Sequence, residues 1–168
     1  MSGPRWAVAT DAAELHQLVI ESDQIAARES GTTAPLRRLA STERCVASGS
    51  SWVWIDVDGH YLATLTVESA PSFDLSQADF PAADCPWYMR RLAVGETGRR
   101  LGVWLSLQAV HLAGQLCASQ GADWLRCEIN PGLTKVADLL LAVGFVVVPS
   151  RRADRADLGW MAWHLGSR

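Results

Sequence analysis

The chain has almost no lysine and no excess of positive charge. Lys135 is the single lysine among 168 residues, and the formal net charge is −3 at pH 7. This balance argues against binding to nucleic acid by bulk electrostatics. No apolar run approaches the roughly 20 residues needed to cross a bilayer, and no secretory signal is recognisable. We therefore expect a cytoplasmic protein with neither a nucleic-acid nor a membrane partner.

Cysteine is also scarce, and its spacing argues against the common cysteine-based sites. The four cysteines lie far apart in the sequence and include no CxxC pair, which disfavours a zinc site and a disulfide framework. We expect buried free thiols and no metal site. The four are Cys45, Cys85, Cys117 and Cys127.

The rest of the composition is that of an ordinary globular protein. Hydrophobic residues make up 49% of the chain and charged residues 20%. A chain of this length can bury a substantial core as one domain. We therefore expect a single domain that spans residues 1–168.

Hydrophobic periodicity predicts strands and helices in the order β-α-α-β-β-β-α-β-α-β-β. Asp58-Gly59 is a strong signal for a hairpin turn, and the proline-rich stretch Ser69–Pro86 predicts a long loop. Strands and helices do not alternate strictly, so we expect a mixed α/β sheet rather than a doubly wound nucleotide-binding fold. The expected elements are a strand at 5–8, a helix capped by Thr10 or Asp11, a helix at 34–47, hairpin strands at 52–57 and 61–67, a strand at 87–94, a helix at 101–120, a strand at 124–129, a helix from 131 or 134 to 142, a strand at 144–148, a charged connector at 151–157 and a strand at 158–165.

The most informative segment is Tyr88–Leu105, where an apolar strand enters a short loop rich in glycine and arginine that opens onto a long amphipathic helix. At such a junction several backbone N–H groups and the positive end of the helix dipole point at one place. This arrangement suits an anion, usually a phosphate group. We therefore predict an anion site, most simply for a phosphate group, at this junction.

The order of elements, the strand end Arg91–Val94, the loop Thr97–Gly102 and a later Gly144-Phe145 resemble the GNAT superfamily of acyl-CoA N-acyltransferases. The resemblance covers essentially the whole chain. It implies an α/β fold with a mixed, mostly antiparallel central sheet of about seven strands flanked by about four helices. It also implies acetyl-CoA, or another acyl-CoA, as cofactor, with the pyrophosphate on the loop and the pantetheine arm beside the preceding strand. The residues implied to bind it are Leu92, Ala93, Val94, Arg99, Arg100, Leu101, Gly102, Val103 and Trp104.

The loop departs from the pattern of this family, which is Arg/Gln-x-x-Gly-x-Gly/Ala. With Gly102 as the last small residue, Thr97 stands in place of Arg or Gln and Arg100 in place of the middle glycine. A β-carbon at that middle position crowds the phosphates, whereas the guanidinium groups of Arg99 and Arg100 offer charge-assisted contacts.

The position of the general acid departs as well. Leu140 stands where the family often has a tyrosine that protonates the leaving thiolate. Leu133 stands where many relatives have an asparagine, unless Asn130-Pro131 is that motif displaced by three residues.

Two residues are candidates for handling the amine proton. Tyr88 stands where some relatives carry a carboxylate base; its ordinary pKa near 10 suits it to orienting a water, and the alternative is a core aromatic. Glu68 ends the preceding strand and is either a base, an amine ligand or a surface carboxylate. Asp74, Asp79 and Asp84 on the long loop either attract a cationic amine or are simply solvated.

Together these features predict an acyl-CoA-dependent N-acyltransferase, most simply an acetyltransferase, that transfers the acyl group directly from the thioester to a small neutral amine. It would act as a monomer or homodimer. The alternative is a GNAT-fold protein without acetyltransferase activity, which binds a small molecule or performs other chemistry. Arg100 and Leu140 motivate that alternative.

Overall fold

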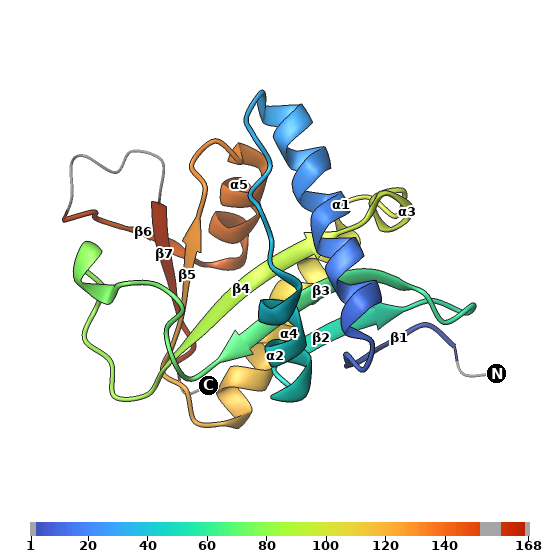
Figure 1. Ribbon diagram of the computed structural model, residues 1–168. Coiled ribbons are helices and arrows are strands. Elements are labelled where there is room, and N and C mark those ends of the chain that lie inside the picture. The colour runs from blue at the N-terminus through green and yellow to red at the C-terminus, as the bar shows by residue number, and fades with distance from the viewer. Residues whose placement is uncertain (1–2, 152–158, 167–168) are drawn as a thin grey trace. The chain divides into compact units, whose positions relative to one another are not determined.

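A computed structural model describes residues 3–151 and 159–166 (Figure 1). Its elements, in chain order, are β1 (Arg5–Val8), α1 (Ala12–Ser30), α2 (Leu39–Ala47), β2 (Ser51–Ile55), β3 (Tyr61–Glu68), the 3-10 turn η1 (Leu75–Gln77), β4 (Pro86–Val94), α3 (Glu96–Arg99), α4 (Trp104–Ser119), β5 (Trp124–Ile129), α5 (Thr134–Val143), β6 (Val146–Val148) and β7 (Gly159–His164). The strands form a seven-stranded sheet in the order β1-β2-β3-β4-β5-β7-β6. β4 and β5 pair in parallel, whereas β1–β2, β2–β3, β5–β7 and β6–β7 pair antiparallel. The predicted α/β class with a mixed sheet is therefore confirmed.

The hairpin and the first helix form where local side-chain chemistry predicts them. Asp56 Oδ1 accepts hydrogen bonds of 2.9 Å from the amides of Asp58 and His60, and Gly59 has a φ of +92°. The turn between β2 and β3 is therefore closed by its own residues. Asp11 caps α1, since its Oδ1 accepts from two amides of the first turn.

Two helices begin later than the sequence pattern predicts. The helix expected from Ala34 begins at Leu39. Pro35 disfavours helical backbone before it, and Arg37 forms a two-point ion pair with Asp23 of α1 that holds the segment extended. The helix expected from Leu101 begins three residues later, after the separate short helix α3.

Part of the predicted C-terminal region is not described. Apart from Arg151, the charged connector at 151–157 and the predicted first residue of the last strand, Leu158, lie outside the described residues. Within the described ranges, no helix has both the length and the apolar composition of a membrane span.

The chain divides into two compact units, which we call the first and the second unit. The first unit comprises Met1–Thr66 and Arg91–Ala109, and the second comprises Val67–Arg90 and Val110–Arg168. The strands β3 and β4 and the helix α4 each contribute residues to both units.

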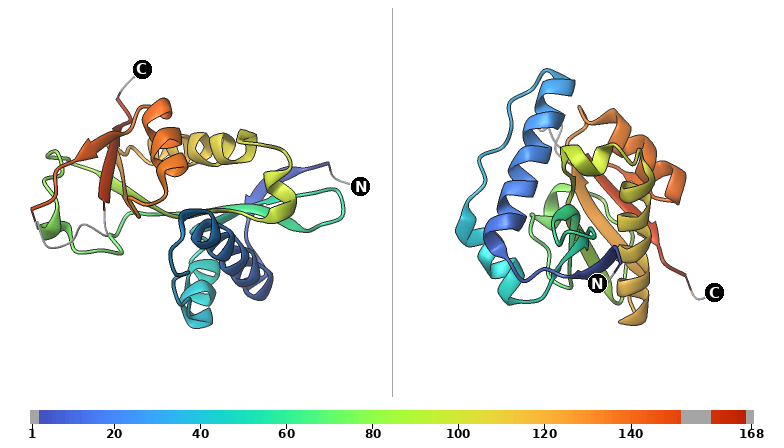
Figure 2. Two further views of the ribbon diagram at one scale, coloured as in Figure 1. Left: turned by 90° about the horizontal axis from the view of Figure 1, so that it is seen from above. Right: turned by 90° about the vertical axis from the view of Figure 1, so that its right-hand side faces the viewer.

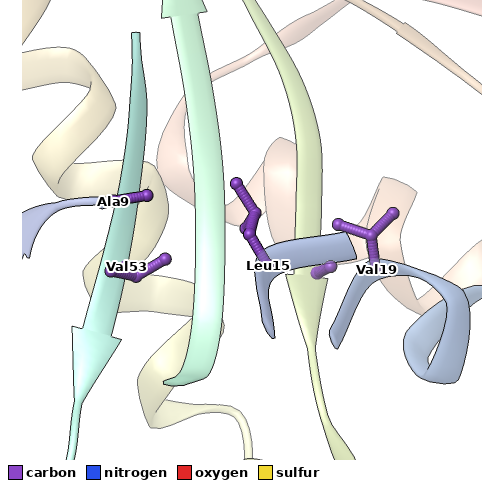
Figure 3. Packing of buried hydrophobic residues seen from close by; sticks show 5 residues of the cluster. Ala9, Leu15, Val19 and Val53 are labelled. Carbon is purple, nitrogen blue, oxygen red and sulfur yellow. The ribbon is translucent and has the colours of Figure 1, made fainter. Parts of the chain in front are cut away.

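The first unit has a hydrophobic cluster on each face of its strands. On one face Leu15 and Val19 of α1 pack with Val53 of β2 (Figure 3). On the other face Leu105, in the first turn of α4, packs with Ala63 of β3. Figure 2 shows the same division, with α1 and α2 on one side of β1–β3 and the start of α4 on the other. This packing fixes the position at which α4 begins.

The second unit is built on the antiparallel pair β5–β7, whose register runs from Trp124 opposite His164 to Ile129 opposite Gly159. Its core cluster combines strand residues, including Trp160, with Phe73 and Phe80 from the loop between β3 and β4. We call residues 69–85 the covering loop; it is drawn in green in Figure 1.

Candidate functional site

The end of β4 and the residues after it are shaped by close backbone contacts. Arg91 has a φ of +54°, a conformation that non-glycine residues rarely adopt within a strand and that is typical of a bulge. Gly98 of α3 lies so close to β3 that an added β-carbon would approach Leu62 O to 2.6 Å. The sequence therefore needs glycine at this position, so that α3 can seat beside the strand end.

The backbone amides after β4 fall into an occupied group and a free group. The amides of Arg99, Arg100, Leu101 and Gly102 donate to the carbonyls of Gly95, Thr97, Gly98 and Arg99 at 2.9–3.2 Å. The next four amides, Val103–Ser106, donate to no acceptor among the described residues, and the first bond of α4 runs from Leu107 N to Val103 O. Of the predicted amides Arg99–Trp104, only those of Val103 and Trp104 are free donors, and the amides of Leu105 and Ser106 continue this free group. The amides of Glu96–Gly98, in the first turn of α3, likewise donate to no acceptor among the described residues.

Gly102 makes the turn that exposes these amides. Its φ is +68°, and no other atom lies within 4 Å of where its β-carbon would stand. Glycine is therefore required here for the backbone conformation rather than for space.

The two loop arginines have different surroundings. Arg99 Nε donates to Val94 O at 3.1 Å, and its guanidinium lies 3.5 Å from a carboxylate oxygen of Glu29. Arg100 is exposed, has ordinary helical backbone with φ −64°, and has no partner among the residues that the structure describes. Arg100 is thus an exposed cation without a described partner, three residues before the free amide of Val103.

The predicted pantetheine strand and the rest of the loop are apolar. Ala93 and Val94 are buried in the two opposite clusters of the first unit, and Val94 N donates to Ser22 Oγ at 3.3 Å. Three exposed apolar side chains surround the free amides: Leu101, Val103 and Trp104. The Trp104 ring packs edge-on against Trp54 at 5.2 Å.

The two candidate catalytic residues, Glu68 and Tyr88, lie in the second unit and each contacts an arginine. Glu68 Oε2 is 2.6 Å from Arg90 Nη2, with both side chains mostly buried. Tyr88 is 3% exposed, and its hydroxyl lies 3.4 Å from Arg126 Nη1. Glu68 is therefore a paired carboxylate rather than a free surface group.

Arg126 is the polar residue that sequence reasoning missed. It is 6% exposed, donates from Nη2 to Pro81 O at 2.5 Å, and lies 5.0 Å over the ring of Phe80. The only signal in the sequence is a single arginine within the apolar strand Trp124–Ile129. That signal does not reveal whether a carboxylate lies nearby.

Two of the three loop acids use their carboxylates in structural contacts. Asp79 pairs with Arg151, and Asp74 accepts from the amide of Ser76 at 2.9 Å. Asp84 contributes only its backbone amide, which donates to Asp123 Oδ2 at 2.7 Å.

Leu140 and the cysteines offer little chemistry. Leu140 is buried at 1% exposure on α5, so the position of the usual tyrosine supplies no proton. Burial raises the pKa of Cys127 to about 12, and burial together with nearby Cys85 raises that of Cys117 to about 12. These two thiols are therefore protonated at neutral pH. Within residues 3–151 and 159–166, no group of His, Cys, Asp and Glu side chains gathers as metal ligands would.

The second unit also contains a half-open cavity of about 860 Å³. Among its lining residues are His111, Asp123, Trp163 and His164. It includes none of the residues predicted to bind the cofactor or to act in catalysis, so it carries no part of the predicted site.

Comparison with known proteins bears on the fold. No protein-family profile matches the sequence, and no curated protein matches it. A GNAT-family acetyltransferase from Streptococcus agalactiae superposes with a TM-score of 0.74 and 15% identity, covering 99% of this chain and 98% of its own. One from Listeria monocytogenes gives 0.71 and 17%, covering 96% and 93%. The Salmonella typhimurium protein yncA, solved with acetyl-CoA, gives 0.65 and 15%, covering 99% and 96%.

Sequence identities this low establish the fold and nothing finer. Together with the sheet order and the β4–α3–α4 junction, they show that the chain has the fold of the GNAT superfamily.

Proposed function

We propose that the protein is an acyl-CoA-dependent N-acyltransferase, most simply an acetyltransferase, with a small amine as acceptor. One observation carries the proposal: in a GNAT fold, four successive amides after Gly102 have no acceptor in the described part of the chain. Backbone donors at the start of a long helix are suited to the diphosphate of a coenzyme A. Arg100, exposed and three residues before the first of these amides, would add a charge-assisted contact to the diphosphate.

The structure supports a different register for the loop pattern. Counting from Arg99 places Gly102 at the middle glycine and Trp104 at the last small position, so two of the three positions are matched. The φ of Gly102 and the start of the free amides directly after it favour this register. In this register Arg100 is a variable position, and its β-carbon is no obstacle.

The remaining tasks fall to residues near the strand ends. Bound acetyl-CoA would supply an acyl group activated as a thioester. The Leu92–Val94 segment would pair with the pantetheine arm. Glu68, paired with Arg90, would receive the amine or its proton, and Tyr88 would orient the acceptor. Because Leu140 has no proton to give, the leaving thiolate would be protonated by solvent.

Thermal unfolding with and without coenzyme tests the proposal. At 100 times its Kd, CoA should add about 2.7 kcal/mol of stability, which for a chain of this size is a rise in Tm of about 5–10 °C. Pantetheine, which has no diphosphate, should give a much smaller rise. Absence of any CoA effect on the wild type would remove the proposal.

A pair of glycine variants localises the site. Gly102→Val forces a β-branched residue into a left-handed conformation, so the loop must rebuild, and CoA affinity should fall by about tenfold or more. Gly121→Val is the matched control, because Gly121 has a similar φ of +77° and equally open space at the other end of α4. It should lower stability similarly and leave CoA affinity unchanged.

The rival function is a GNAT-fold protein that binds CoA or another ligand without transferring an acyl group. The buried Leu140 at the position of the usual acid favours it. Thiol release from acetyl-CoA, measured across a panel of amines, separates the two. Thiol release that depends on the amine supports the enzyme, whereas CoA binding without thiol release supports the rival.

A further inference from the structure

The second unit contains a buried guanidinium that lacks a carboxylate. Arg126 is 6% exposed, and its described contacts are the Tyr88 hydroxyl, the Pro81 carbonyl and the face of Phe80. No acidic side chain within the described ranges pairs with it, and its buried Nε has no hydrogen-bond partner. An arginine stays charged even when buried, and a buried charge without a counter-ion is unfavourable, so an anion bound here would be stabilised.

A second orphan donor lies on the same face of the strands. Trp160 is 1% exposed, and its Nε1 also has no acceptor. In the β5–β7 register Arg126 lies opposite Ala162, and Trp160 is two residues from Ala162 on the same strand. Alternation places Arg126 and Trp160 on one face as diagonal neighbours, a relation in which the backbone positions lie roughly 7–8 Å apart. Side chains as long as these can span that spacing, so their two buried N–H donors can reach the same carboxylate.

The surroundings of these donors are aromatic. Phe73 and Phe80 of the covering loop pack over this face with Trp160, and Phe73 meets the Tyr88 ring edge-on at 5.8 Å. A ligand whose carboxylate reached Arg126 would therefore place its remaining atoms against aromatic rings. The charge and the lining together select a carboxylate attached to an aromatic or apolar group.

We infer that Arg126 Nε and Trp160 Nε1 bind the carboxylate of a small aromatic or apolar acid. Because Arg126 also donates to Pro81, the covering loop is closed over the site, and the ligand enters when the loop opens. If the chain is an acyltransferase, as proposed above, this acid is its acceptor, and the acceptor class is amino acids with an aromatic side chain. The carboxylate site itself does not depend on that activity.

Calorimetry on the full chain, without coenzyme, tests the inference. The probes are phenylalanine, tryptophan, phenylacetate and indole-3-acetate, each compared with phenethylamine or tryptamine, which carry no carboxylate. We expect at least one of the acids to bind and both amines to bind about tenfold more weakly or worse. Equal affinity for acids and amines, or no binding of any acid, overturns the inference.

Variants then assign the binding to the two donors. Arg126→Met should weaken acid binding about tenfold or more, and Trp160→Phe, which removes only the N–H and the smaller part of the ring, by a smaller factor. Arg151→Met is the matched control: it removes an exposed guanidinium that ties down the same loop through Asp79, and it should leave acid affinity unchanged.

The same variants distinguish a binding role from a structural one. If Arg126 serves a ligand, Arg126→Met without ligand should keep its Tm within about 4 °C of wild type or raise it, because a buried unpaired charge is removed. If Arg126→Met fails to fold while Arg126→Lys and Trp160→Phe bind the acids like wild type, the guanidinium is a structural tie to the covering loop and the inference is wrong. If the acids bind but CoA does not raise the Tm of the wild type, the proposed acyltransferase function is wrong and the carboxylate site stands.

Discussion

The two compact units each leave N–H donors without a described acceptor, but they do so in opposite ways. In the first unit the larger group consists of backbone amides, Val103–Ser106, at the start of α4, and a single buried side-chain donor, Trp6 Nε1, stands apart from it. In the second unit the donors are side-chain groups of Arg126 and Trp160, buried on one face of the strands. Backbone donors depend on the course of the chain alone, whereas side-chain donors depend on the particular residues.

This difference separates a general site from a selective one. Amides at a strand-to-helix junction bind a diphosphate whatever the neighbouring side chains are, so this part can be shared across a fold. A buried arginine beside aromatic rings discriminates among ligands, because an analogue that lacks the carboxylate leaves buried donors unpaired. In our proposals, the first unit therefore holds the coenzyme and the second selects the acceptor.

The largest expected effect is on stability, and it compares a glycine packed against backbone in the first unit with a glycine packed against a side chain in the second. A β-carbon at Gly98 would meet Leu62 O at 2.6 Å, a backbone atom that cannot move alone, whereas one at Gly114 would meet the Trp163 ring at 2.6 Å. Gly98→Ala should therefore cost about 3 kcal/mol and Gly114→Ala about 1 kcal/mol or less, since a ring can shift and alanine favours the helix. Urea unfolding of both variants checks this, and equal losses would contradict it.

The next effect tests recognition by the backbone in the first unit. Trp104→Ala removes a ring that packs on Trp54, which should cost about 1 kcal/mol of stability. Because Trp104 stands at a position where the GNAT pattern has a small residue, CoA affinity should be retained or increase.

Arg100→Gly separates the two loop registers. In the register that begins at Arg99, this change removes a free guanidinium and weakens CoA binding by a few-fold. In the register that begins at Thr97, it restores the missing glycine and strengthens binding. CoA titrations of the wild type and of Arg100→Gly distinguish the registers by the sign of the change in affinity.

The turn and the helix start of the first unit could be predicted from the sequence because their signals are local. Gly102 and the apolar pattern of α4 announce a turn and a helix start within a few residues. The set of free amides could not be predicted, because the short helix α3 uses the donors of Arg99–Gly102 first. A four-residue helix leaves no periodicity to detect.

The proposed carboxylate site could not be predicted, because it depends on the absence of an acidic partner for Arg126. In the sequence, Arg126 is a single arginine within an apolar strand. The structure adds that β4, β7 and the covering loop place no carboxylate against it within the described residues. Glu68 was placed on the correct strand, but its ion pair with Arg90 of β4 is a contact between two strands and leaves no local signal in the sequence. The same holds for α2, whose late start reflects the Arg37–Asp23 ion pair.

The smallest expected effect concerns the anchor of the covering loop in the second unit. Burial works against ionisation of Asp123, but the amides of Asp84 and Cys85, with those of Asp123 and Trp124, hold its pKa below the ordinary 3.8. A lowered native pKa stabilises the fold at pH values above the unfolded pKa, and this stabilisation is lost as the pH falls through the native pKa. This charge-dependent stabilisation is small, because solvent screens the group.

Asp123→Asn should therefore lower the free energy of unfolding at pH 7 by less than about 1 kcal/mol. The difference should shrink at acid pH, as the pH falls below the ordinary 3.8 and through the lowered native pKa. Asp138→Asn, an exposed acid on α5, is the control in urea unfolding at both pH values. If Asp123→Asn remains less stable than the wild type at low pH, the contact depends on the shape of the side chain rather than on its charge. The covering loop of the second unit would then be held by geometry, as the Gly102 turn of the first unit is.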